Sequence, residues 1–267
     1  MNLIEVLTSQ VLIKSLLVSF LSSSAITLLG IFVVLKKSIF ITLAISEVAG
    51  LGLILGLYLG INPYGSMILI TFFIVILFSF YKNKKYFSED KIVAIIYALS
   101  FCLSIILLSK TTFSQTHIID SLVGNVLAIS NIELILDFVC FLICVLFFIL
   151  FHKQLFFIYS DPETSCVFGL NYNFLNFLFF LVVGFSIVCF LKSIGIILSF
   201  SYLSIPCSFA IIKAKKISDL ISKSLIISLS SSFFGTITSF IFDIPLAATI
   251  VIYLGIFGVL FTIFIRS

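Results

Sequence analysis

One ionisable side chain lies inside an otherwise apolar stretch of this sequence. Glu47 is the single carboxylate of "LAISEVAGLGLILGLYLG", residues 43–60. A carboxylate there could bind a divalent cation or exchange a proton along a translocation path. A protonated carboxyl that is hydrogen-bonded to a hydroxyl of a neighbouring segment is the structural alternative. The surroundings of Glu47 decide between these roles.

A second set of polar side chains lies in residues 195–212, "GIILSFSYLSIPCSFAII". Three serines share one helix face at offsets 0, 3 and 7, namely Ser201, Ser204 and Ser208. Pro206 frees a backbone carbonyl, which a cavity or a neighbouring helix must satisfy. Together with Ser46 and Glu47, this face predicts a polar path between two helices. Serines that bond back to their own helix are the alternative.

The composition is that of a membrane protein. Of 267 residues, 62% are hydrophobic and 10% are charged, whereas soluble domains are about 45–50% apolar and about 25% charged. Apolar runs of about 20 residues, each long enough to cross a hydrocarbon core of about 30 Å, recur along the chain. The sequence predicts an all-α, polytopic transmembrane bundle that forms a single domain over residues 1–267.

Nine apolar segments are candidate spans, and eight crossings result if one of them does not span fully. They cover residues 12–35, 39–59, 64–81, 92–109, 132–151, 174–192, 195–212, 220–242 and 246–265. Lys and Arg gather in cytoplasmic loops, so their distribution orients the chain. With Lys36 and Lys37 inside, alternation places twelve of the 15 basic residues inside and three outside or at the outer interface. The N-terminus is therefore expected outside and the C-terminus inside.

The inner loop at about residues 152–173 has helix signals of its own. It contains the run Ser160, Asp161, Pro162 and Glu163. This run supplies a capping residue, a proline tolerated in the first turn, and an acid at the positive end of the helix dipole. Gly169, followed by Asn171, then ends the helix. We expect a short helix here, either a solvated linker or a docking element for a cytoplasmic partner.

Two serine-rich segments echo one another. "KSLLVSFLSSSAITLLG" (14–30) is similar to "KSLIISLSSSFFGTITS" (223–239), and the predicted topology runs them in opposite directions. Inverted repeats are common in transporters. A chance echo between two Ser- and Leu-rich helices is the alternative.

Motifs for catalysis are missing from the sequence. It contains no GxxxxGK[ST] phosphate loop, so the chain cannot hydrolyse ATP by that route, and it contains no HExxH zinc motif. The net charge of +4 comes from short clusters between apolar runs, which does not indicate nucleic-acid binding. We predict a conduit that is not an enzyme and binds no cofactor of its own.

Six stretches, in this order, resemble the integral-membrane permease subunits of bacterial ABC transporters for zinc and manganese, over nearly the whole chain. They are "LLGIFVVLKKSIFITLAIS", "GLGLILGLYLGINP", "SLVGNVLAIS", "YSDPETSCVFGLNYNFLN", "KSIGIILSFSYLSIPCSFA" and "FDIPLAATIVIYLG". The resemblance implies a homodimeric permease of the bacterial inner membrane that transports Zn²⁺, the first expectation, or Mn²⁺. It also implies a cytoplasmic ATPase subunit that uses ATP and docks at residues 160–170, and an extracytoplasmic metal-binding protein.

The sequence departs from this family at Glu47. Family members have Gly-Asp early in the second helix, with Ser-His three residues after the Asp; here the positions are Thr42, Leu43, Ser46 and Glu47. Carboxylate oxygen binds Mn²⁺ or Zn²⁺, whereas imidazole suits zinc better. Either Glu47 replaces the histidine and shifts preference toward a harder cation, or the site has drifted. A carboxylate at the bilayer centre costs about 2.5–3.5 kcal/mol, which favours the first interpretation.

Two other classes of function stay open from the residues. A secondary transporter could use Glu47 as its ion- or proton-coupling site. A structural membrane protein would need no polar path at all. Removal of ATP separates the first of these from the ABC interpretation.

Overall fold

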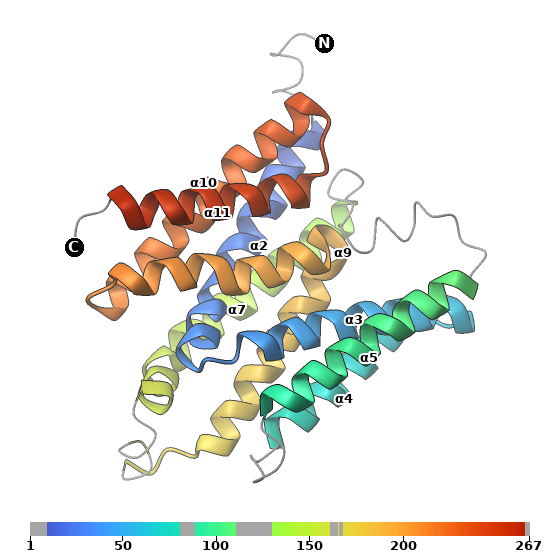
Figure 1. Cartoon of the computed structure of the whole chain (residues 1–267), viewed down its shortest axis with the longest axis horizontal. Helices are drawn as coiled ribbons and strands as arrows, with labels where there is room; N and C mark the ends of the chain where they lie inside the picture. Colours follow the sequence, from blue (N-terminus) through green and yellow to red (C-terminus); the bar gives the residue numbers. More distant parts are fainter. Residues whose placement is uncertain (1–9, 81–88, 111–129, 161–164, 166–167, 265–267) are drawn as a thin grey trace.

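The computed structural model describes residues 10–80, 89–110, 130–160, 165 and 168–264, and all secondary structure in these ranges is helical. The helices, shown in Figure 1, are α2 (Gln10–Leu35), α3 (Ile39–Leu59), α4 (Pro63–Phe80), α5 (Glu89–Lys110), α7 (Asn131–Ser160), α9 (Tyr172–Lys213), α10 (Ile217–Phe242) and α11 (Leu246–Phe264). Seven of the described helices are long and apolar enough to cross a membrane, and α4 is a shorter apolar helix. The predicted all-α bundle is confirmed.

The helix α9 contains two predicted spans, residues 174–192 and 195–212. A straight helix of its 42 residues would be about 63 Å long, twice the bilayer core of about 30 Å. The helix bends at Gly195, with φ 79° and ψ 173°, a conformation that is essentially restricted to glycine. Its yellow and orange halves leave the bend in different directions (Figure 1).

Several helix ends follow local signals of the sequence. Gly60, with φ 67°, ends α3, and the Asn62 side chain accepts a hydrogen bond from the Tyr64 N–H at 3.0 Å to begin α4. Ser130 and Glu133 form a reciprocal capping box at the start of α7. The N–H of Ser130 donates to Glu133 Oε2 at 2.9 Å, and the N–H of Glu133 donates to Ser130 Oγ at 3.3 Å.

Contacts between helix ends agree with the predicted alternation of the spans. Among the ends predicted inside, Nζ of Lys36, the residue after α2, donates to Asn176 Oδ1 of α9 at 2.7 Å. Among the ends predicted outside, Lys192 of α9 forms an ion pair with Glu133 of α7, and its Nζ lies 4.9 Å from the centre of the Tyr64 ring of α4. Helix ends that were assigned to the same side of the membrane therefore contact one another. The assignment of one side as cytoplasmic is a prediction from the distribution of Lys and Arg.

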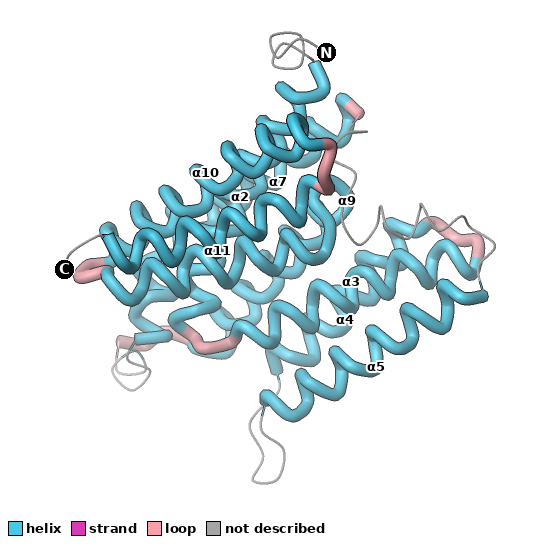
Figure 2. The backbone as a smooth tube through the Cα atoms, turned by 45° about the horizontal axis from the view of Figure 1, so that its top comes forward, coloured by secondary structure: helices cyan, strands magenta, loops and turns pink. Residues whose placement is uncertain are grey.

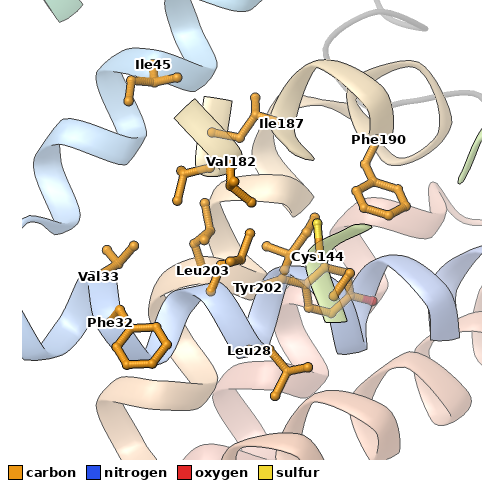
Figure 3. Close-up of a cluster of buried hydrophobic side chains, with 14 of the residues drawn as sticks. Leu28, Phe32, Val33, Ile45, Cys144, Val182, Ile187, Phe190, Tyr202 and Leu203 are labelled. Carbon is orange, nitrogen blue, oxygen red and sulfur yellow. The ribbon is translucent and has the colours of Figure 1, made fainter. Parts of the chain in front are cut away.

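The buried core includes side chains from α2, α3, α7 and α9. Figure 3 shows Phe32 of α2, Ile45 of α3, Cys144 of α7 and Leu203 of α9 in one buried cluster. The central helix is α9, because it packs against α2, α3, α4, α7, α10 and α11. The geometry of α9 therefore affects most of the bundle.

Small residues allow close backbone approaches, as the glycine spacing in α3 indicates. A Cβ added at Gly52 would lie 2.8 Å from Met67 Cα of α4, and a Cβ added at Gly30 of α2 would lie 2.3 Å from the Leu203 carbonyl oxygen of α9. No side chain larger than hydrogen fits at either position without moving a helix.

The two echoing segments face one another in antiparallel α2 and α10 (Figure 2). The Ser19 and Thr236 hydroxyl oxygens lie 3.3 Å apart, and Thr27 Oγ1 lies 2.9 Å from Ser228 Oγ. The alignment that matches Ser19 with Ser228 also matches Thr27 with Thr236. A local two-fold relation therefore exchanges these hydroxyl pairs, which supports the inverted arrangement for this pair of helices.

Candidate functional site

Glu47 lies in the middle of α3 with 6% of its surface exposed. No hydrogen bond or ion pair joins it to another residue of the described ranges, so the hydroxyl donor required by the structural alternative is not found there. Every fully buried side-chain oxygen or nitrogen in the described part of the chain has a partner. The Glu47 oxygens therefore keep a small accessible area. A carboxylate in this position has a physical reason to take up a cation or a proton.

The bend of α9 lies against the same region of α3. Gly50 follows Glu47 by three residues, so the two share a face of the helix. A Cβ added at Gly50 would lie 2.4 Å from Ile196 Cδ1, and Ile196 is the residue after Gly195. The position of the bend therefore determines what packs beside Glu47.

The predicted path serines of α9 bond back to their own helix, which is the alternative considered for them. Each donates to the carbonyl one turn earlier, at 2.8 Å for Ser201, 2.9 Å for Ser204 and 2.7 Å for Ser208. Ser46 of α3 likewise donates to the Thr42 carbonyl at 2.9 Å. No hydrogen bond between these hydroxyls and Glu47 is found in the described ranges. The hydroxyl oxygens keep their capacity to accept hydrogen bonds.

The carbonyl freed by Pro206 is satisfied by a neighbouring helix. Proline at 206 removes the donor for the carbonyl of Tyr202, four residues earlier. Thr27 Oγ1 of α2 lies 3.3 Å from that carbonyl oxygen. Pro206 therefore serves the contact between α2 and α9, and no cavity is needed to satisfy its freed carbonyl.

Of the predicted docking residues, Gly169 lies in the described part of the chain; Asp161, Pro162 and Glu163 lie outside it. Gly169 has φ 73°. The N–H of Leu170 donates to the Ser165 carbonyl at 3.2 Å, the six-to-one bond that closes a helix C-terminus at a left-handed residue. The turn predicted at Gly169 is therefore present, whereas most of the short helix expected before it lies outside the described residues.

An exposed aromatic side chain lies beside this turn. Phe168 is 71% exposed, and its ring centre lies 5.7 Å from that of Phe157, edge to face. The helix α7 continues to Ser160, beyond its predicted span, and so brings Phe157 to the same region. A cavity of about 260 Å³ is lined by Lys153, Gln154, Phe157, Phe168 and Leu170.

The sequence analysis did not single out Asp137, a second buried acid. It lies in α7 with 1% of its surface exposed and accepts a hydrogen bond from Ser193 Oγ of α9 at 2.6 Å. Asp137 lies inside the predicted span 132–151, so the insertion cost that drew attention to Glu47 could have identified it. Its partner could not be identified without the fold.

No group of three His, Cys, Asp or Glu side chains in the described ranges could hold a metal ion.

The chain matches the ABC 3 transport family over residues 8–265. It is 26% identical over 243 residues to the high-affinity zinc uptake system membrane protein ZnuB of Haemophilus influenzae, covering 91% of this chain and 93% of that protein. It is 27% identical over 252 residues to the manganese transport system membrane protein MntB of Synechocystis, covering 94% and 82%. In fold it is similar to PsaBC of Streptococcus pneumoniae solved with a Fab, with a TM-score of 0.86 and 22% identity over 98% of this chain and 94% of that chain.

Proposed function

Because this chain belongs to the ABC 3 transport family, we propose that it is the membrane permease subunit of an ATP-driven importer for a divalent transition-metal ion. It is a multi-pass protein of the bacterial inner membrane. Zinc is the first expectation for its substrate and manganese the second, since relatives are named for both. One observation carries the proposal, namely that Glu47 is buried in α3 without a partner in the described ranges.

The proposed path runs between α3 and α9. Glu47 is its metal ligand, and Ser46, Ser201, Ser204 and Ser208 line it. Their hydroxyl oxygens can accept hydrogen bonds from the water that a cation carries. Alternating access follows if a partner ATPase moves the cytoplasmic ends of the helices and the bend of α9 shifts beside Glu47.

The proposed partners are a cytoplasmic ATPase subunit, an extracytoplasmic metal-binding protein and a second copy of this chain. The ATPase would dock at Asp161, Pro162, Glu163 and Gly169. The exposed Phe168 ring beside Gly169 supports this surface. The charge distribution predicts this loop on the cytoplasmic side, where a large exposed apolar side chain is characteristic of an interface anchor.

Replacement of Phe168 with Ser is expected to weaken co-purification of the ATPase subunit about tenfold or more, since one buried aromatic anchor contributes about 2 kcal/mol or more to an interface. Pull-down of the ATPase with tagged permease, at matched membrane levels, measures this. Phe242→Ser is the matched control, because Phe242 is 68% exposed at the opposite end of the bundle. Equal recovery of the ATPase with both variants would remove Phe168 from the docking surface.

Replacement of Ser201, Ser204 and Ser208 together with Ala is expected to lower the metal transport rate several-fold, at unchanged thermal stability. Their hydroxyl protons bond within α9, so their loss breaks no contact between helices. Uptake assays and melting curves in detergent measure the two effects. An unchanged transport rate would place these serines off the path.

The unpartnered carboxylate also suits a secondary transporter that couples transport to protons through Glu47. Uptake of radioactive zinc or manganese by cells that express the chain with its ATPase and binding protein separates the two functions. The ABC proposal requires uptake to stop when the ATPase is inactivated and to persist when the proton gradient is collapsed. The opposite result would establish the secondary transporter.

A further inference from the structure

We infer that Asp137 is a positioning residue for transport, which holds the Gly195 bend of α9 in place beside Glu47. This inference rests on the proposed function for its effect on metal uptake. The contact that carries it is the hydrogen bond from Ser193 Oγ to Asp137 Oδ2, at 2.6 Å. This distance is in the range of a hydroxyl that donates to a carboxylate oxygen.

Ser193 differs from the other serines of α9 in the partner of its hydroxyl. Ser186, which is also buried in α9, donates to the Val183 carbonyl of its own helix at 2.8 Å, as the serines of the predicted path do within their helix. The hydroxyl of Ser193 instead crosses to α7. This bond therefore holds two helices together, and its loss is expected to change their relative position more than the loss of an internal bond.

A second contact between α7 and α9 lies one turn away on α7. Glu133 precedes Asp137 by four residues, and it forms an ion pair with Lys192, the residue before Ser193. The two bonds fix consecutive residues of α9 on one face of α7. Lys192 and Ser193 lie three and two residues before Gly195, where the chain direction changes. The start of the second half of α9 is thus set by contacts with α7.

The bend at Gly195 connects the position of α9 relative to α7 with the surroundings of Glu47. Gly195 is followed by Ile196, whose Cδ1 occupies the space that a Cβ of Gly50 would need. Gly50 shares a face of α3 with Glu47. A chain of adjoining residues therefore links Asp137 to Glu47, through Ser193 and the bend. Because a misplacement of about 1 Å can strongly impair an aligned site, loss of the Asp137 contact should weaken metal capture.

The test uses the full chain in four variants: Asp137→Ala, Asp137→Asn, Ser193→Ala and, as matched control, Ser186→Ala. The first readout is hydrogen–deuterium exchange of the amides of residues 193–203 in the purified chain, which requires no transport. The second is the KM and the zinc-to-manganese rate ratio of uptake, in cells that also express the ATPase and the binding protein.

Asp137→Ala and Ser193→Ala are expected to speed exchange next to the bend about tenfold and to raise KM about tenfold. Asp137→Asn keeps an oxygen acceptor for Ser193 and should stay within about twofold of wild type, as should Ser186→Ala. If Asp137→Ala does not reach the membrane folded, Ser193→Ala and Asp137→Asn decide the question.

Exchange and KM at the level of Ser186→Ala would overturn the inference, and so would faster exchange with an unchanged KM. If exchange rises as expected but even the wild-type chain takes up neither metal, the proposed function fails and the structural tie stands.

Discussion

Glu47→Ala is expected to lower accumulation of zinc or manganese at least about tenfold. No group of three His, Cys, Asp or Glu side chains in the described ranges could hold the metal in its place. The measurement is cellular metal content by mass spectrometry. Cells express the chain with its ATPase and binding protein, at matched protein levels. Since Glu47 forms no hydrogen bond or ion pair in the described ranges that its loss would break, the Ala variant should remain folded.

Conservative variants at the same position separate charge from shape. Glu47→Gln keeps the size of the side chain and removes the anionic ligand, so it should fail as Glu47→Ala does. Glu47→His supplies the imidazole that the family resemblance places here and should favour zinc over manganese, because imidazole is the better zinc ligand. Wild-type accumulation by both Glu47→Ala and Glu47→Gln would make Glu47 structural and leave the path without its proposed ligand.

The helical architecture could be predicted from the sequence because segments that cross a lipid bilayer must be long, apolar and helical. Apolar runs had to become helices, since backbone groups in hydrocarbon must bond within their own segment. The turn from Gly60 to Asn62 and the stop at Gly169 followed from residue types that favour those conformations. The joining of two predicted spans into the single helix α9 could not be predicted from the sequence. A glycine at this position is equally compatible with a bend inside one helix and with a break between two helices.

The hydrogen-bond partners of buried polar side chains could not be predicted from the sequence, for a different reason. The carbonyl freed by Pro206 could be predicted, but its contact with Thr27 joins residues that lie far apart in the chain. The same holds for Asp137 and Ser193. The insertion cost identifies a polar residue in lipid, whereas only the fold shows whether it is paired, as Asp137 is, or unpaired in the described ranges, as Glu47 is.

The close contact of α2 with α9 makes Gly30 the position where one methyl group should cost most. In Gly30→Ala the new Cβ would lie 2.3 Å from the Leu203 carbonyl oxygen and 2.9 Å from its carbonyl carbon. Both are backbone atoms of the central helix, so no rotamer change relieves the clash, and the two helices must separate. Such overpacking costs about 1–3 kcal/mol or more.

The Gly30→Ala variant is expected to melt about 5–10 °C below wild type in detergent, because each kcal/mol shifts the melting temperature of a chain of about this size by about 2–4 °C. Gly255→Ala in α11 is the matched control, since nothing lies within 4 Å of a Cβ built there. Alanine also has a better helix propensity than glycine by about 1 kcal/mol, so this control should melt at or above the wild-type temperature. Equal melting of both variants would mean that α2 and α9 can separate at little cost. The packing of the bundle around α9 would then be looser than its backbone contacts imply.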